Sequence, residues 1–150
     1  MKSIYNILLT VLLLILMSVF VIPQKNSVPP QEENQIHNAV EELFKLSKQK
    51  NYEKAAALIV YNGEDSNRKL KAVLNPQNED ELNAAKRICK KIAALLNVSE
   101  KYSIKEIVNE KNQERKITKV EVTFLNAGQE LLITLKFVKL PSGYALLEIN

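Results

Sequence analysis

The chain has 150 residues, a hydrophobic fraction of 46% and a formal net charge of +4 at pH 7. This length is enough for one ordinary domain with its own core. The basic excess is mild and lacks the concentrated stripe and interleaved aromatics of nucleic-acid binders, so we expect no nucleic-acid partner. The single cysteine, Cys89, cannot form an intramolecular disulfide, which excludes a disulfide-stapled scaffold.

Residues 1–22 carry the strongest local signal in the sequence. The uncharged run from Ile4 to Ile22 is nineteen residues long, close to the roughly 20 that cross a bilayer as a helix. No pair of small residues suited to signal peptidase follows the run near Pro23, which favours an uncleaved signal anchor over a cleaved signal peptide. Lys2 and the amino terminus precede the run, so we expect the domain to lie outside the cytoplasm.

These features predict a single-pass protein of the bacterial inner membrane with its domain on the extracytoplasmic side. The alternative is a secreted or periplasmic protein after signal cleavage. Residues 23–35 contain three prolines and few apolar side chains, which is typical of an extended linker. We therefore assign residues 1–22 to the signal anchor or signal peptide, 23–35 to a linker and 36–150 to one α+β domain.

Helical periodicity dominates the first half of this domain. Residues 35–49 form an amphipathic pattern with an apolar face, and Asn51 is placed to cap a second helix over residues 52–60. We expect a short helix over residues 66–74 and a long helix over residues 79–96. The apolar stripe of the long helix comprises Leu82, Ala85, Cys89, Ile92 and Leu96.

The period changes from helical to alternating after residue 101. We expect strands near residues 102–108, 119–124, 131–138 and 144–149, joined by turns that include Gly128 and Gly143. In the second of these strands, Glu121 alternates with Val120 and Val122 and is therefore expected to point outward. Helices followed by an antiparallel meander predict an α+β fold in which helices pack against a curved sheet.

Two stretches carry a resemblance to a known superfamily. FKLSKQKNYEKAAALI (residues 44–59) and FVKLPSGYALLEI (residues 137–149) resemble the first helical hairpin and the last strand hairpin of small bacterial envelope domains in the nuclear transport factor 2-like (cystatin-like) superfamily. The resemblance implies a cone-like fold, with a bent sheet wrapped around helices. This fold hosts isomerases, dehydratases, binding modules and assembly scaffolds alike.

No catalytic set emerges from the sequence. Enzymes that share the resemblance use Asp, His and Tyr side chains inside the cone, whereas here His37 lies beside the linker and Asp65 and Asp80 lie in or next to loops. Cys89 lies on an apolar stripe and is expected to pack in the core. We predict no metal and no cofactor, and we lean against an enzyme.

Two groups of residues are candidates for binding. Aromatic side chains could line an apolar pocket or simply fill the core: Tyr102, Phe124, Phe137 and Tyr144. Basic side chains on the long helix could contact an anionic surface or be solvated: Lys86, Arg87, Lys90 and Lys91. We expect a non-enzymatic envelope accessory domain that binds a protein partner or a small apolar ligand, in an oligomeric state the sequence leaves open. The alternatives are a small cone-fold hydrolase or isomerase, and a ligand-free spacer or oligomerisation domain.

Overall fold

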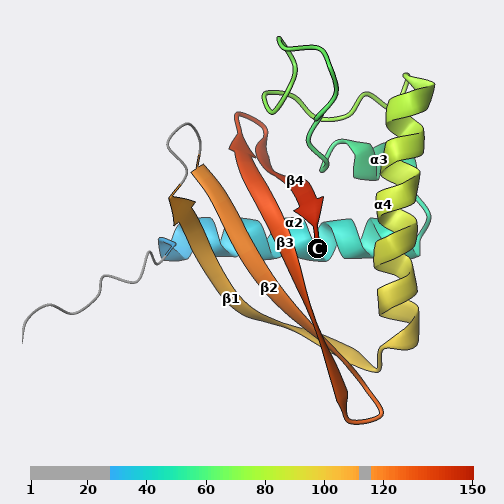
Figure 1. Ribbon diagram of the computed structural model, residues 1–150, viewed down its shortest axis with the longest axis vertical. Coiled ribbons are helices and arrows are strands. Elements are labelled where there is room, and N and C mark those ends of the chain that lie inside the picture. Colours follow the sequence, from blue (N-terminus) through green and yellow to red (C-terminus); the bar gives the residue numbers. More distant parts are fainter. Residues whose placement is uncertain (1–27, 112–115) are drawn as a thin grey trace, which may run out of the picture.

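The computed structural model describes residues 28–111 and 116–150. In this part of the chain, three helices precede a four-stranded antiparallel sheet in which each strand pairs with its neighbour in sequence (Figure 1). The predicted α+β class is therefore confirmed. The predicted hydrophobic helix of residues 1–22 lies outside the described residues, and none of the helices within them is long and apolar enough to cross a membrane.

Helix α2 (Pro30–Lys48) begins five residues earlier than its periodicity predicts. Residues 30–35, which we assigned to the linker, form its first turns. Pro30 is tolerated at the first helical position because no backbone N–H donor is needed there, and Glu32 and Glu33 interact favourably with the positive end of the helix. The buried side chains are those of the predicted apolar face together with Leu46.

Helix α3 (Tyr52–Ala56) is shorter than predicted. Its expected cap is present, since the Asn51 side chain accepts a hydrogen bond from the backbone N–H of Lys54 at 3.3 Å. The chain leaves the helix because Ile59 and Val60 pair instead with extended backbone: Ile59 bridges Leu146, and Val60 bridges Val73. The end of α3 is therefore set by long-range pairing rather than by local helix preference.

The predicted helix over residues 66–74 is wrong. These residues form turns, Leu70 has a positive φ of 58°, and Val73 lies in an extended bridge. A left-handed residue interrupts a helix, and the pairing with Val60 replaces the hydrogen bonds that a helix would supply.

Helix α4 (Glu79–Val98) starts where predicted and ends two residues later. The Asn78 side chain caps it by accepting a hydrogen bond from the Glu81 N–H at 3.1 Å. Ala85, Cys89 and Ile92 are fully buried, so the centre of the predicted stripe does face the core.

The sheet consists of β1 (Lys101–Lys111), β2 (Lys116–Asn126), β3 (Gln129–Leu140) and β4 (Gly143–Ile149). Two residues with positive φ, Ala127 and Gly128, make the tight turn between β2 and β3. The β1–β2 register shifts between Ile104 and Glu106, and the β3–β4 register shifts after Lys136. Such bulges bend the strands on which they occur.

The core lies between the helices and one face of the sheet, called here the inner face. Alternate residues of the strands join the buried face of α2 and α4 there, as the two-residue period requires. A smaller apolar cluster forms on the outer face, where Leu70 and Val73 pack against Val138 and Leu140. The segment between α3 and α4 thus covers one part of the outer face.

Candidate binding groove

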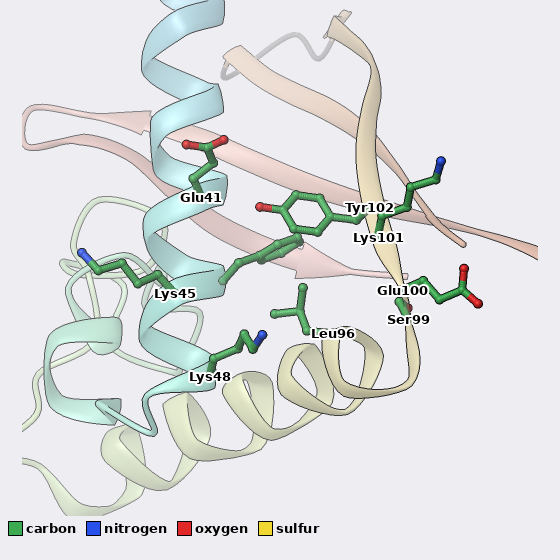
Figure 2. Close-up of a pocket in the computed structure, with 9 residues that line it drawn as sticks. Glu41, Lys45, Lys48, Leu96, Ser99, Glu100, Lys101 and Tyr102 are labelled. Carbon is green, nitrogen blue, oxygen red and sulfur yellow. The ribbon is translucent and has the colours of Figure 1, made fainter. Parts of the chain in front are cut away.

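A cavity of about 430 Å³ opens between the second half of α2, the end of α4 and the start of β1 (Figure 2). We call it the α2–β1 groove. Apolar side chains from all three elements line it: Phe44, Leu96 and Tyr102. The Tyr102 ring projects from β1 toward α2 and lies edge-on to Phe44, with ring centroids 5.1 Å apart. The groove therefore has an aromatic wall supported by two different parts of the chain.

The rim of the groove is rich in charge. Its acidic side chains are engaged: Glu41 lies 3.4 Å from the His37 ring, and Glu100 accepts a hydrogen bond from the Ala127 N–H at 3.1 Å. Lys48 and Lys101 also line the groove, and neither makes an ion pair within the described residues. In Figure 2, Lys48 extends from α2 toward Leu96. The rim thus carries both signs of charge: Lys48 and Lys101 make no ion pair within the described residues, and the Glu41 and Glu100 carboxylates line the same groove.

The apolar wall continues along the inner face of the sheet. Tyr102 pairs with Phe124 across β1–β2, and Phe124 pairs with Leu131 across β2–β3, so the three side chains form a row on one face. Phe124 is buried, whereas Tyr102 is 37% exposed and Leu131 is 49% exposed. Val98, at the end of α4, is another exposed apolar residue. The groove and this row thus place several exposed apolar side chains at one end of the domain.

Only one of the four predicted pocket-lining aromatics lines the groove. Tyr102 does, while Phe124 supports it from beneath with a ring centroid 6.1 Å away. Phe137 is fully buried in the core. Tyr144 is also buried, at the opposite end of the inner face near Glu32, where it lines a separate cavity of about 610 Å³ together with Lys139 and Leu140. Two of the four predicted aromatics, Tyr102 and Phe124, therefore lie at or under the groove. The other two lie several residue pairs away along the sheet.

Tyr144 lies in a polar cluster of its own. Glu32 binds the ammonium groups of Lys116 and Lys139, the latter at 2.9 Å. The Tyr144 hydroxyl is buried close to Glu32 and Thr118, without a hydrogen bond of good geometry to any described residue. Burial, followed by the charge of the Glu32 carboxylate, raises the pKa of Tyr144 to about 12. Beside it, Thr118 donates a hydrogen bond to Asn109 at 2.9 Å. Sequence reasoning missed Glu32 because its partners, Lys116 and Lys139, are 84 and 107 residues away in the chain. It missed Thr118 because its partner Asn109 lies on the neighbouring strand.

The charge states in this cluster are unsuited to acid–base chemistry near neutral pH. Hydrogen bonds from Lys116 and Lys139 lower the pKa of Glu32 to about 2, so its carboxylate is a weak base. Tyr144, with its raised pKa, remains neutral. A general acid or base works best when its pKa lies near the operating pH. The ion pairs of the cluster hold the start of α2 against β2 and β3.

The remaining candidates for catalysis lie apart from one another. His37 is exposed on α2, Asp65 accepts a backbone hydrogen bond in the 61–78 segment, and Asp80 is exposed in the first turn of α4. Glu121 pairs with Lys119, and Glu148 pairs with Lys136, on the outer face. Cys89 is buried, and burial raises the pKa of its thiol.

The predicted basic cluster on α4 is partly occupied by internal contacts. Lys91 donates a hydrogen bond to the backbone carbonyl of Ile149 at 3.0 Å, and Lys86 is half-buried with its ammonium 3.4 Å from Asn83. Arg87 and Lys90 are exposed. Contact of this helix face with an anionic surface stays a prediction.

The described elements together define a domain in which helices pack on the inner face of a curved antiparallel sheet. No family model and no curated protein matches the chain. Among solved structures, it is similar to an NTF2-like protein with a cystatin-like fold from Novosphingobium aromaticivorans, at 12% identity and a TM-score of 0.42, with 79% of each chain covered.

Proposed function

We propose that the chain is a non-enzymatic accessory domain of the bacterial cell envelope that binds a protein partner through the α2–β1 groove. The observation that carries the proposal is the combination of exposed Tyr102 and Leu131 with the unpaired Lys48 and Lys101. Exposed apolar side chains grouped at one place, with charge at their rim, are typical of interaction sites.

The chemistry of the groove specifies the partner segment. An aromatic or aliphatic side chain would bury against Phe44 and Tyr102, which stabilises a complex through the hydrophobic effect. Acidic residues on either side of this anchor would approach Lys48 and Lys101, which make no ion pair within the described domain, while Glu41 and Glu100 on the same rim would restrict where these acidic residues lie. We therefore propose that the occupant is an acidic peptide segment with an apolar anchor residue.

The envelope placement rests on residues 1–22. Their uncharged length and the preceding Lys2 support membrane insertion with the domain outside the cytoplasm. A fusion of alkaline phosphatase to Asn150 of the full chain tests this placement in bacterial cells. The fusion should be active and should sediment with membranes. An inactive fusion would contradict export, and an active soluble fusion would indicate signal cleavage.

Peptide selection tests the groove. The full chain in detergent is used to select from a library of random peptides displayed on phage. The selected peptides should combine acidic residues with at least one aromatic or large aliphatic residue. Binding should fall at least tenfold in the Lys48→Glu/Lys101→Glu variant and in Tyr102→Ala, since each removes part of the rim or the wall. It should also weaken as salt rises.

The matched control is Lys54→Glu/Lys69→Glu, which reverses two exposed lysines away from the groove. This variant should retain binding. Selection of peptides that lack acidic residues, or equal losses in both double variants, would refute the groove as an acidic-peptide site. Selected peptides that are wholly apolar would point to a small apolar ligand as the occupant.

A further inference from the structure

A second cavity, also about 430 Å³, lies on another side of the domain between the start of α4, the segment after α3 and β4. We call it the α4 pocket. Its apolar lining includes Ile59, Leu74, Ile88 and Leu147, and Ala84 forms part of its helical wall. A volume of this size falls within the range of about 300–1,000 Å³ that small-molecule sites occupy.

The walls of the α4 pocket are fixed by a dense set of contacts. Val60 donates a backbone hydrogen bond to Leu146 at 2.8 Å, and Leu74 donates one to Ile59 at 2.9 Å. These bonds hold the segment after α3 against both β4 and the chain that leads into α4. A pocket whose walls are already ordered loses little conformational entropy when a ligand binds.

Arg68 and Glu81 connect the outer segment to α4. The two Arg68 terminal nitrogens donate to the two Glu81 carboxylate oxygens at 2.7 and 2.8 Å, and the Asn75 N–H donates to the same carboxylate at 2.6 Å. Hydrogen bonding to Arg68 lowers the pKa of Glu81. This bidentate pair neutralises Glu81, although the residue lines the pocket.

Tyr61 forms a rigid aromatic side of the pocket. The Arg68 guanidinium lies 4.2 Å from its ring centroid, and its hydroxyl accepts a hydrogen bond from the Asp65 N–H at 3.3 Å. A Cβ atom on Gly63 would lie only 2.4 Å from the Tyr61 hydroxyl oxygen. Glycine at this position therefore allows the backbone to pass close to the ring.

Asp80 supplies the charge of the pocket. The charged residues that line it are Asp80 and Glu81, and Glu81 is already paired with Arg68. Asp80 is exposed at the rim and makes no ion pair within the described part of the chain. No lysine or arginine is among the residues lining the described pocket. Asp80 is therefore the one lining carboxylate of the described pocket that no side-chain cation pairs with, and a cationic group of a ligand could approach it at the rim.

We infer that the α4 pocket binds a small molecule with an apolar body and one cationic group. The apolar body packs against Tyr61, Ala84 and Leu147, and the cation lies beside the Asp80 carboxylate. This site is separate from the α2–β1 groove and shares no lining residue with it.

Phenethylamine, which is protonated at pH 7, is a suitable probe, and 3-phenylpropionate is its matched anion with the same ring and spacer. The full chain in detergent is titrated with each compound while its backbone amide signals are followed by NMR. Phenethylamine should shift amides of Asn62, Ala84 and Leu147 in a saturable way. With about nine non-hydrogen atoms it should have a dissociation constant on the order of 1 mM.

Three variants separate the contributions. Ala84→Phe should abolish the saturable shifts by filling the pocket, and Asp80→Asn should weaken phenethylamine binding about three- to tenfold through loss of the charge pair. Glu79→Gln removes a neighbouring exposed carboxylate that does not line the pocket and should leave binding unchanged. Asp80→Asn alters an exposed side chain, so it remains informative if Ala84→Phe fails to fold.

The two probes also give the results that would overturn the inference. Equal affinity for phenethylamine and 3-phenylpropionate would contradict the proposed preference of the pocket for a cationic group. Absence of saturable shifts at Asn62, Ala84 and Leu147 would show that the probe does not bind in the α4 pocket. Binding that persists in a folded Ala84→Phe variant would lead to the same conclusion. None of these outcomes bears on the peptide selection at the α2–β1 groove, so the two proposals can fail separately.

Discussion

The two ends of the inner face of the sheet are built in opposite ways. At the end near the start of α2, Glu32 binds both Lys116 and Lys139 close to the buried Tyr144. At the other end, Tyr102 and Leu131 stay exposed. The ion pairs at the first end join residues more than eighty positions apart in the chain. At the second end, apolar side chains remain in contact with solvent.

This difference suggests that one end contributes mainly to the stability of the fold and the other mainly to partner binding. At the first end, the ion pairs of Glu32 tie the start of α2 to β2 and β3 and so contribute to folding. An exposed aromatic beside unpaired lysines contributes less to folding, and its burial in a complex would be favourable. We expect substitutions at the first end to change mainly the free energy of unfolding, and those at the second end to change mainly partner binding.

The largest effect is expected from Phe137→Ala. Phe137 is fully buried on the inner face, opposite Thr118 and Leu146 in the sheet register. Truncation should lower the free energy of unfolding by about 3–5 kcal/mol through the cavity it leaves. Urea unfolding followed by circular dichroism measures this. Phe137→Leu should cost less than about 1.5 kcal/mol. A loss below about 1 kcal/mol for the alanine variant would contradict a filled interior at this end.

Glu32→Gln should produce a smaller and pH-dependent effect. The folded-state pKa of Glu32 is lowered to about 2 from an ordinary value of 4.5, so its stabilisation is present above pH 4.5 and is lost as pH falls toward 2. Since both lysines are substantially exposed, we expect a contribution of about 1 kcal/mol at pH 7.

Unfolding of wild type and Glu32→Gln across this pH range measures the contribution. The difference between the two should shrink as the pH is lowered through the range from 4.5 to 2. Glu33→Gln is the control, because Glu33 is exposed on the same turn and has no such pair of lysines. A constant difference at all pH values would mean that Glu32 acts through packing and not through its charge.

Leu131→Ser should have the smallest effect on stability. Its side chain is 49% exposed, so we expect a change within about 0.5 kcal/mol, while capture of the selected peptides weakens. Ile133→Ala, two residues along the same face, removes a buried side chain and should cost about 2–5 kcal/mol. Equal losses for the two variants would contradict the difference in burial between Leu131 and Ile133 on this face.

Local patterns predicted the elements well where the pattern and the packing agree. Asn51 and Asn78 both precede a helix that the structure contains, and the alternation of Val120 with Glu121 predicts which side faces the core. The period of the amphipathic helices indicated the buried side chains because one face of each helix must cover the sheet. These signals lie within a few residues of the feature they predict.

The failures involve contacts between distant residues. Residues 66–74 have helical composition, yet the pairing of Val60 with Val73 and the attachment of Arg68 to Glu81 set their path. The same holds for the candidate sites. Tyr102 and Tyr144 look alike in sequence, and only the positions of α2 and α4 make one a groove wall and the other a buried residue.

The bulge in β1 has a consequence for the behaviour of the protein at high concentration. β1 is an edge strand of eleven residues, and its outer backbone groups have no neighbouring strand in the described sheet. A long, flat edge would template the addition of strands from other copies. The register shift between Ile104 and Glu106 breaks that regularity, and the exposed Lys101 and Lys105 place like charges on any copy that approaches. The edge beside the groove is therefore protected against aggregation.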